Sequence, residues 1–145
     1  MNREIKFRGR TPEGKWLYGD LLRVAGGTLI YYGSPVEAET CELEGIGVAL
    51  MSNEIAVVVP ETVGQFTGLR DRNGEDIYEG DILHIGRSKK SKPVAYSNEY
   101  AAFGIQYPDR DFFPFAYDLQ DISETCYEVI GNIHDNPELK KGGAK

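Results

Sequence analysis

The chain has 145 residues, a hydrophobic fraction of 41% and a net charge of −7. A chain of this length buries roughly 68–70% of its unfolded surface, which argues against wholesale disorder and against a need for disulfide staples. No apolar run approaches the ~20 residues of a membrane-spanning helix, and the first residues lack the apolar core of a signal peptide. We therefore expect a globular, cytoplasmic protein.

Glycine and aromatic residues indicate the fold class. The sequence holds 17 Gly, 7 Pro, 9 Tyr and 6 Phe, a composition that favours many short strands joined by tight turns. Its two cysteines, Cys41 and Cys126, lie far apart in the chain and are expected to be reduced thiols. The composition thus predicts a mainly β protein.

The N-terminal residues predict a β-hairpin. Arg3 to Arg8 alternate between charged and apolar side chains, which is the period of a half-buried strand. Thr11-Pro12-Glu13-Gly14 carries Pro and Gly at the positions that a type I turn favours. Strand character resumes at Trp16 to Tyr18 and, after Gly19-Asp20, at Leu21 to Val24.

The segment from Gly64 to Ile85 predicts a second hairpin and a further strand. Asn73-Gly74 predicts a type I′ turn, in which both central residues need a positive φ. Glu79-Gly80-Asp81 then turns the chain into a strand over Ile82 to Ile85, in which His84 would face outward.

These two segments resemble each other. Phe7-Arg8-Gly9 corresponds to Phe66-Thr67-Gly68, and Gly19 to Val24 corresponds to Gly80 to Ile85. The offset grows only from 59 residues (66 − 7) to 61 residues (80 − 19). One interpretation is an internal duplication. The other is that turn chemistry and strand alternation recur by chance.

The domain organisation follows from the same pattern. We expect one compact β domain over residues 1–139 or, if the duplication holds, two related β units at about 1–59 and 60–139. Asn136-Pro137 fits the start of a brief helix. Residues 140–145 are expected to be a frayed tail.

A basic island at Gly86 to Pro93 is interpreted as the solvated tip of a hairpin. Its Lys89, Lys90 and Lys92 form the one patch suited to phosphate contact, and three lysines give modest, salt-sensitive affinity. The neighbouring sequence opposes nucleic acid, since nine acidic residues between Pro93 and Leu139 accompany a single arginine.

Four aromatic residues cluster within residues 112–117, with acidic residues on both sides: Phe112, Phe113, Phe115 and Tyr117. Aromatic rings can stack on bases, but the flanking acids repel a phosphate backbone. We interpret the cluster as packing at the end of a barrel, or as a contact surface for a protein partner or a second subunit.

No motif predicts a catalytic or metal site. Asp71 to Glu75 superficially resembles a calcium loop, but its Gly is fourth, whereas an EF-hand loop needs Gly at the sixth position. Glu79 and Asp81 are better explained as turn residues than as paired catalytic carboxylates. Four residues could ligate zinc only if the fold gathered them, because none has zinc-site spacing: Cys41, His84, Cys126 and His134. We expect no enzyme activity, no metal and no cofactor.

Four blocks carry a family resemblance: Arg3 to Arg8, Pro60 to Leu69, Asn73-Gly74 with Ile77 to Ile82, and Glu128 to Leu139. In this order they resemble the YopX family of phage and prophage proteins. The resemblance implies a small, mostly β protein with an SH3-like barrel, and it brings no established activity and no catalytic residues. We therefore predict an SH3-like small barrel built from hairpins, with short helical turns.

Three hypotheses for function remain open. The leading one is a non-enzymatic module that binds another macromolecule or assembles with itself as a homo-oligomer. The second is an acidic protein whose carboxylates between residues 93 and 139 mimic nucleic acid and block a host protein. The third is weak nucleic-acid binding through the basic loop at 87–92.

Overall fold

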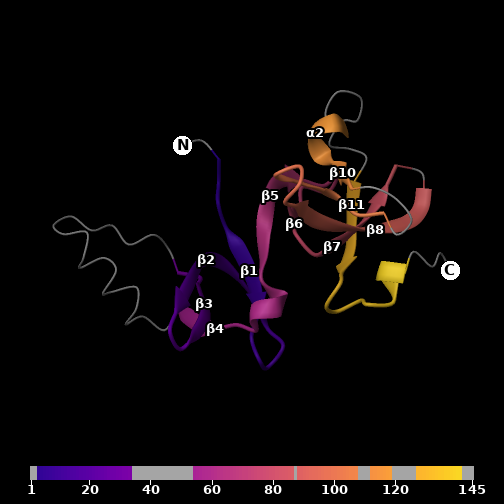
Figure 1. The fold of residues 1–145 in the computed structure, drawn as a ribbon. Helices are drawn as coiled ribbons and strands as arrows, with labels where there is room; N and C mark the ends of the chain where they lie inside the picture. The colour runs from indigo at the N-terminus through magenta and orange to yellow at the C-terminus, as the bar shows by residue number, and fades with distance from the viewer. Residues whose placement is uncertain (1–2, 34–53, 87, 108–111, 119–126, 142–145) are drawn as a thin grey trace. The chain divides into compact units, whose positions relative to one another are not determined.

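The computed structural model describes residues 3–33, 54–86, 88–107, 112–118 and 127–141, with the backbone alone described for 88–90, 117, 118 and 141. As predicted, the fold is mainly β with short helical turns (Figure 1). The strands are β1 (Phe7–Arg10), β2 (Trp16–Val24), β3 (Gly27–Tyr31), β4 (Ile55–Val57), β5 (Gly64–Arg70), β6 (Asp76–Tyr78), β7 (Asp81–Ile85), β8 (Ser88–Ser97), β9 (Ala102–Ile105), β10 (Phe113–Pro114) and β11 (Tyr127–Asn132). The helical turns are η1 (Pro60–Thr62), α2 (Phe115–Asp118) and η3 (Leu139–Lys141).

The strands form two antiparallel sheets. Their orders are β4-β3-β2-β1-β5-β6 and β10-β9-β8-β7-β11. Within the described part of the chain, no strand pairing closes either sheet on itself, so the predicted SH3-like barrel is not confirmed. The chain divides into two compact units, residues 1–65 and 66–145, with the boundary inside β5. No helix among the described residues is long and apolar enough to cross a bilayer.

The first unit is built on the N-terminal hairpin. β1 begins at Phe7, four residues later than predicted, and pairs with β2 from Phe7 opposite Gly19 to Arg10 opposite Trp16. β2 is one continuous strand through Gly19, where two strands were predicted. The close approach of β3 to β2 at this point requires glycine, because any side chain at position 19 would overlap the carbonyl oxygen of Tyr31 on β3. The core of this unit contains Leu17, Ile30 and Val58, with Phe7, Leu21, Ala56 and Val63 packed against it.

The second unit is organised around β7, which pairs with β8 on one side and with β11 on the other. Ile82 and Leu83 point to opposite faces of this strand and are both 0% exposed, so β7 is covered on both faces there. His84 is half-buried rather than fully outward. The core consists of six buried residues, one from each of β6, β7, β8, β9, α2 and β11: Ile77, Leu83, Val94, Ile105, Phe115 and Tyr127.

The predicted type I′ turn at Asn73-Gly74 is wrong. Gly74 has a φ of 79°, but Asn73 does not share the positive φ, since Ala101 is the one described non-glycine residue that has it. Instead, the Gly74 N–H donates to the carbonyl of Asp71 at 2.9 Å, and the Asp71 N–H donates to the carbonyl of Glu75 at 2.8 Å. A single left-handed glycine after a right-handed turn is the three-residue type of hairpin loop.

The N-terminal hairpin has the same turn. The Gly14 N–H donates to the carbonyl of Thr11 at 2.9 Å, and the Thr11 N–H donates to the carbonyl of Lys15 at 2.8 Å. The strands that follow differ, because β2 runs on without a break whereas β6 and β7 are separated by Glu79-Gly80. The two turns are alike, but the predicted duplication is not confirmed.

The lysines of the basic island do not lie in a hairpin tip. Gly86 lies in the turn after β7, but β8 starts at Ser88 and contains Lys89, Lys90 and Lys92, so the predicted loop is wrong over residues 88–93. The strand extends to Ser97 because its second half finds a new partner in β9, with Val94 opposite Ile105 and Ser97 opposite Ala102. Pairing of the first half of β8 with β7 overrides the weak β-propensity of lysine and serine there.

Candidate partner-binding surface

The acidic turn residues have structural roles. Asp71 is only 4% exposed. Its Oδ1 accepts the N–H groups of Asn73 and Glu75 at 2.8 and 2.9 Å, and its Oδ2 accepts the N–H of Val129 on β11 at 3.0 Å. Burial alone would raise the pKa of Asp71, but these three donors and the nearby guanidinium of Arg72 hold it below its ordinary value. The carboxylate therefore fixes the hairpin turn to β11.

Asp81 acts in a similar way at the second turn. It is 1% exposed, and its Oδ2 accepts the N–H of Tyr78 at 2.7 Å. The Gly80 N–H donates to the carbonyl of Val94, and the Gly80 carbonyl accepts the N–H of Ile133. The turn is thus tied to β8 and to the end of β11, and the Asp81 carboxylate helps to hold it through the Tyr78 N–H.

The C-terminal block with Asn132 and Asn136 is a hydrogen-bonded loop. The Asn132 Oδ1 accepts the N–H groups of His134 and Asp135 at 3.0 and 2.9 Å. The Asn136 Oδ1 accepts the Asn132 N–H at 3.3 Å and occupies the space where a side chain on Gly131 would lie. These residues shape the backbone after β11 rather than offer free ligands.

The four candidate zinc ligands are not brought together within the described structure. His84 lies on β7 opposite Glu128 and Ser91, and His134 lies in the loop after β11. Cys41 and Cys126 lie outside the described residues. Across the described residues, no group of three or more His, Cys, Asp or Glu side chains is placed to hold a metal ion.

The three candidate lysines lie along one strand. Lys92 sits opposite Leu83 of β7, and its ammonium lies 4.7 Å from the centre of the Tyr107 ring. Such a distance is typical of a cation–π contact. The backbones of Lys89 and Lys90 lie nearer the start of β8, and their side chains are outside the description.

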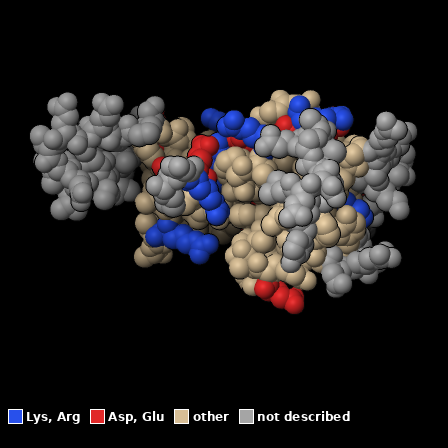
Figure 2. Space-filling model, turned by 90° about the horizontal axis from the view of Figure 1, so that it is seen from above, with Lys and Arg blue, Asp and Glu red and all other residues tan. Residues whose placement is uncertain are grey.

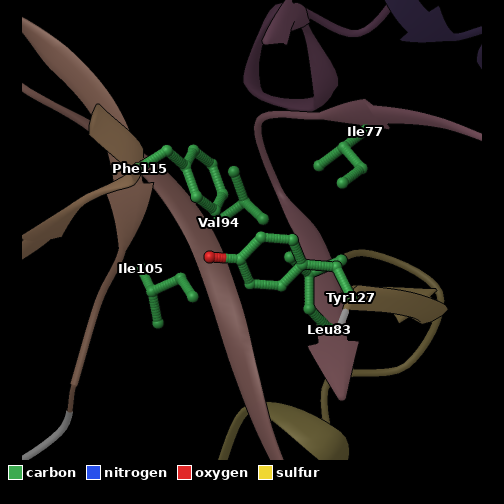
Figure 3. Packing of buried hydrophobic residues seen from close by; sticks show 6 residues of the cluster. All are labelled: Ile77, Leu83, Val94, Ile105, Phe115 and Tyr127. Carbon is green, nitrogen blue, oxygen red and sulfur yellow. The ribbon is translucent and has the colours of Figure 1, made fainter. Parts of the chain in front are cut away.

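The four candidate aromatic residues separate into different environments. Phe115 is 5% exposed and belongs to the core, where its ring meets that of Tyr127 at 5.5 Å and 72°. Figure 3 shows the two rings directed toward each other beside Val94 and Ile105. Phe113 on β10 is 38% exposed, and Phe112 is half-buried. The side chain of Tyr117 lies outside the description.

The β8–β9 hairpin adds aromatic residues that the sequence analysis did not single out. Tyr96 and Phe103 face each other across the two strands, with ring centres 5.1 Å apart in an edge-to-face arrangement. Tyr100, in the turn between the strands, stacks on Phe112 at 5.7 Å. The register places Tyr96 and Phe103 on the hairpin face of Ile105, whereas Phe112 lies against Gly104 on the opposite face. We call the rings on and beside this hairpin, taken together, the aromatic surface: Tyr96, Tyr100, Phe103, Phe112 and Phe113. Strand alternation on either side of Ser97-Asn98-Glu99 could have indicated the Tyr96–Phe103 pair.

A glycine makes room for part of this surface. A side chain on Gly104 would lie 2.7 Å from the Cζ of Phe112 and would overlap the carbonyl oxygen of Phe113. Both β9 and β10 therefore approach closely at this point, with Phe113 opposite Ile105 and Pro114 opposite Gly104. Pro114 has no backbone N–H to donate to a ladder, which is compatible with its place in a two-residue edge strand.

The aromatic surface contains all the exposed large hydrophobic side chains described in the second unit. Tyr96 is 44%, Tyr100 43% and Phe113 38% exposed. Exposed aromatic side chains are enriched at sites that bind a partner. Tyr96 and Tyr100 each contact a neighbouring ring, which restricts their motion and lowers the entropic cost of binding.

Acidic side chains do not form one face in the visible part of the molecule. Figure 2 shows the Asp and Glu side chains of described residues in small, separate groups. Of the nine acids between Pro93 and Leu139, the side chains of Glu99, Glu128, Asp135 and Glu138 are described, and Glu128 pairs with Arg72. The other five lie outside the description, so the nucleic-acid mimic stays a prediction.

Comparisons with known proteins agree with the sequence pattern. A model of the family described as YopX protein matches residues 6–141. Among solved structures, protein EF1440 from Enterococcus faecalis is similar, with 27% sequence identity and a TM-score of 0.58. The match covers 96% of this chain and 99% of that chain. A search of curated proteins finds no match.

Proposed function

The chain belongs to the YopX family, and we propose that it is a non-enzymatic module that binds a protein partner, or a second copy of itself, through the aromatic surface. The observation that carries this proposal is the exposure of Tyr96, Tyr100 and Phe113, which lie on the β8–β9 hairpin and on the adjoining β10. The polar residues that first suggested chemistry bond to backbone groups within the fold, as Asp71 and Asp81 do. A phage or prophage origin and a cytoplasmic location accompany the proposal as predictions.

The test compares partner capture by matched variants. We propose to replace Tyr96 and Phe113 together by Ala, and to use Tyr18→Ala as the control because Tyr18 is 50% exposed and lies in the first unit. Proteins that co-purify from the bacterium carrying the gene are identified, then purified and titrated against each variant. The expected result is binding by the wild type and the control, with at least a tenfold loss for the double variant. Equal affinity of all three proteins contradicts the proposal.

Self-association has its own measurement. Sedimentation of the purified wild type over a range of concentrations reports whether a second copy is the partner. If it is, the same double variant shifts the protein to monomer while Tyr18→Ala does not. A dimer that survives the double variant places the subunit contact elsewhere.

Nucleic-acid binding through β8 is the alternative with a described contact. The Lys92 ammonium is held over the Tyr107 ring, where it can still reach a phosphate with its remaining hydrogen-bond donors. A gel-shift experiment with single-stranded and double-stranded nucleic acid tests it. A shift that is unchanged when Lys89, Lys90 and Lys92 are all replaced by Ala eliminates this alternative.

A further inference from the structure

The loop between β5 and β6 carries an asparagine followed by a glycine, and we propose that Asn73 is a site of spontaneous deamidation to aspartate and isoaspartate. In this reaction the backbone nitrogen of the following residue attacks the side-chain amide carbon. Asn73 and Gly74 are both exposed, so water reaches the two groups that react. Gly74 has no side chain to obstruct the approach of its own nitrogen.

The reaction consumes only water and releases ammonia. The Gly74 nitrogen loses its proton to solvent and forms a bond to the Asn73 Cγ, while the side-chain amide group leaves as ammonia. The resulting succinimide ring takes up one water molecule. Hydrolysis of the new bond to Cγ gives aspartate, whereas hydrolysis of the original peptide bond leaves the chain connected through Cγ as isoaspartate. Isoaspartate places one additional carbon in the backbone.

The hydrogen bonds of the loop control the rate. The Gly74 N–H donates to the carbonyl of Asp71 at 2.9 Å, and the Asn73 N–H donates to the Asp71 Oδ1 at 2.8 Å. The Gly74 nitrogen attacks only after it gives up the proton that the Asp71 carbonyl holds. Deamidation therefore proceeds from molecules in which the loop has opened, and its rate follows the population of that locally open state.

Isoaspartate at position 73 weakens the attachment of this loop to β11. The Asp71 Oδ1 accepts the N–H groups of Asn73 and Glu75, and its Oδ2 accepts the N–H of Val129. The additional carbon enters the backbone between the two N–H groups that share Oδ1, so the lengthened loop cannot keep both in place. The modification also adds a second carboxylate near that of Asp71. The inference thus describes a slow, irreversible loosening of the second unit.

The chain contains its own comparison sites. Three further asparagines are described, and they precede a glutamate, an isoleucine and a proline: Asn98, Asn132 and Asn136. A β-branched side chain crowds the attacking nitrogen, and proline has no N–H to give up. Asn98 is the closest match, because it is exposed and lies in a turn, as Asn73 does. Comparison of Asn73 with Asn98 isolates the effect of the glycine.

The experiment incubates the purified full chain in mildly alkaline buffer and maps its peptides by mass spectrometry over time. Fragmentation that distinguishes isoaspartate from aspartate identifies the product at each site. We expect Asn73 to be modified at least tenfold faster than Asn98, and faster in urea-unfolded chain than in folded chain. Asp71→Asn should accelerate modification of folded Asn73 by about fivefold, the factor that corresponds to one lost hydrogen bond.

Three outcomes overturn the inference. Modification of Asn73 no faster than that of Asn98 shows that it is not a preferred site. Equal rates in the folded and the urea-unfolded chain show that the loop does not control the reaction. The third outcome concerns stability, for which Asn73→Gln is the control, because the longer glutamine side chain cyclises much more slowly. Aged wild type should unfold at lower urea concentration than fresh protein, whereas aged Asn73→Gln should not; equal stability of aged and fresh wild type refutes the loosening. None of these measurements involves the aromatic surface, so they test this inference independently of the proposed function.

Discussion

Replacing Asp71 by Asn tests whether the buried carboxylate holds the second unit together. The amide keeps one oxygen, which can still accept the N–H groups of Asn73 and Glu75. Its NH2 group then faces the N–H of Val129, so a buried donor loses its acceptor. A buried unsatisfied donor costs about 1–3 kcal/mol. Loss of the charge weakens the two remaining bonds as well, so we expect a total destabilisation of about 2–4 kcal/mol.

The effect should depend on pH with a definite sign. Because the folded-state pKa of Asp71 is lowered, its contribution is complete above the unfolded value of about 3.9 and is lost as the pH falls through the folded value. The free energy of unfolding, measured by urea titration, should therefore differ most between wild type and variant near neutral pH. The two proteins should converge in acid.

A matched control is Asp76→Asn. Asp76 is a half-buried carboxylate of the same hairpin that accepts from the Arg70 Nε at 2.9 Å, in a pair whose arginine is exposed. Pairs at the surface are worth roughly 0–1 kcal/mol, so this change should have a small effect. If Asp71→Asn is as mild as the control, or if its effect is the same at pH 3 and pH 7, our account of Asp71 is refuted.

Three further predictions concern packing and surface charge. Gly19→Ala should cost about 1–3 kcal/mol or more, because the new methyl overlaps the carbonyl oxygen of Tyr31, whereas Gly26→Ala meets no atom and should be neutral in the same urea titration. Leu83→Ala should lower the free energy of unfolding by about 2–5 kcal/mol, since Leu83 is fully buried, and a smaller loss would indicate that β7 can repack. Glu128→Gln breaks a solvent-accessible ion pair and should change stability by less than about 1 kcal/mol, with any difference vanishing in high salt; a larger, salt-independent loss would contradict this.

Turn residues were the best guide to this fold, but they could not predict turn types that depend on contacts distant in sequence. Gly14 and Gly74 marked two hairpins that the structure contains. The turn type at Asn73 could not be read from the dipeptide, because the buried carboxylate of Asp71 stabilises a different loop by accepting two of its N–H groups. That carboxylate is buried only because β11, more than fifty residues further on, passes over it.

The candidate surface was predictable only in part. The run of aromatic residues in the sequence indicated a contact surface at Phe112 and Phe113. It could not show that the Phe115 side chain is buried in the core. Tyr96 and Phe103 lie seven positions apart in sequence, and they become neighbours through strand register, which is set by pairing over the whole of β8. Local pattern cannot supply that information when one strand exchanges partners midway.

The position of β11 has a consequence for how the protein forms during synthesis. The first unit ends at residue 65 and contains β1 to β4 and the two residues of β5 that pair with β1, so that unit can fold as soon as these residues leave the ribosome. In the second unit, β7 lacks one of its two neighbours until residues 127–132 are made. Until then Asp71 has no Val129 N–H to accept and the Arg72 N–H has no Tyr127 carbonyl to meet. We therefore expect nascent chains stalled before residue 127 to have a protease-resistant first unit and a protease-sensitive second one.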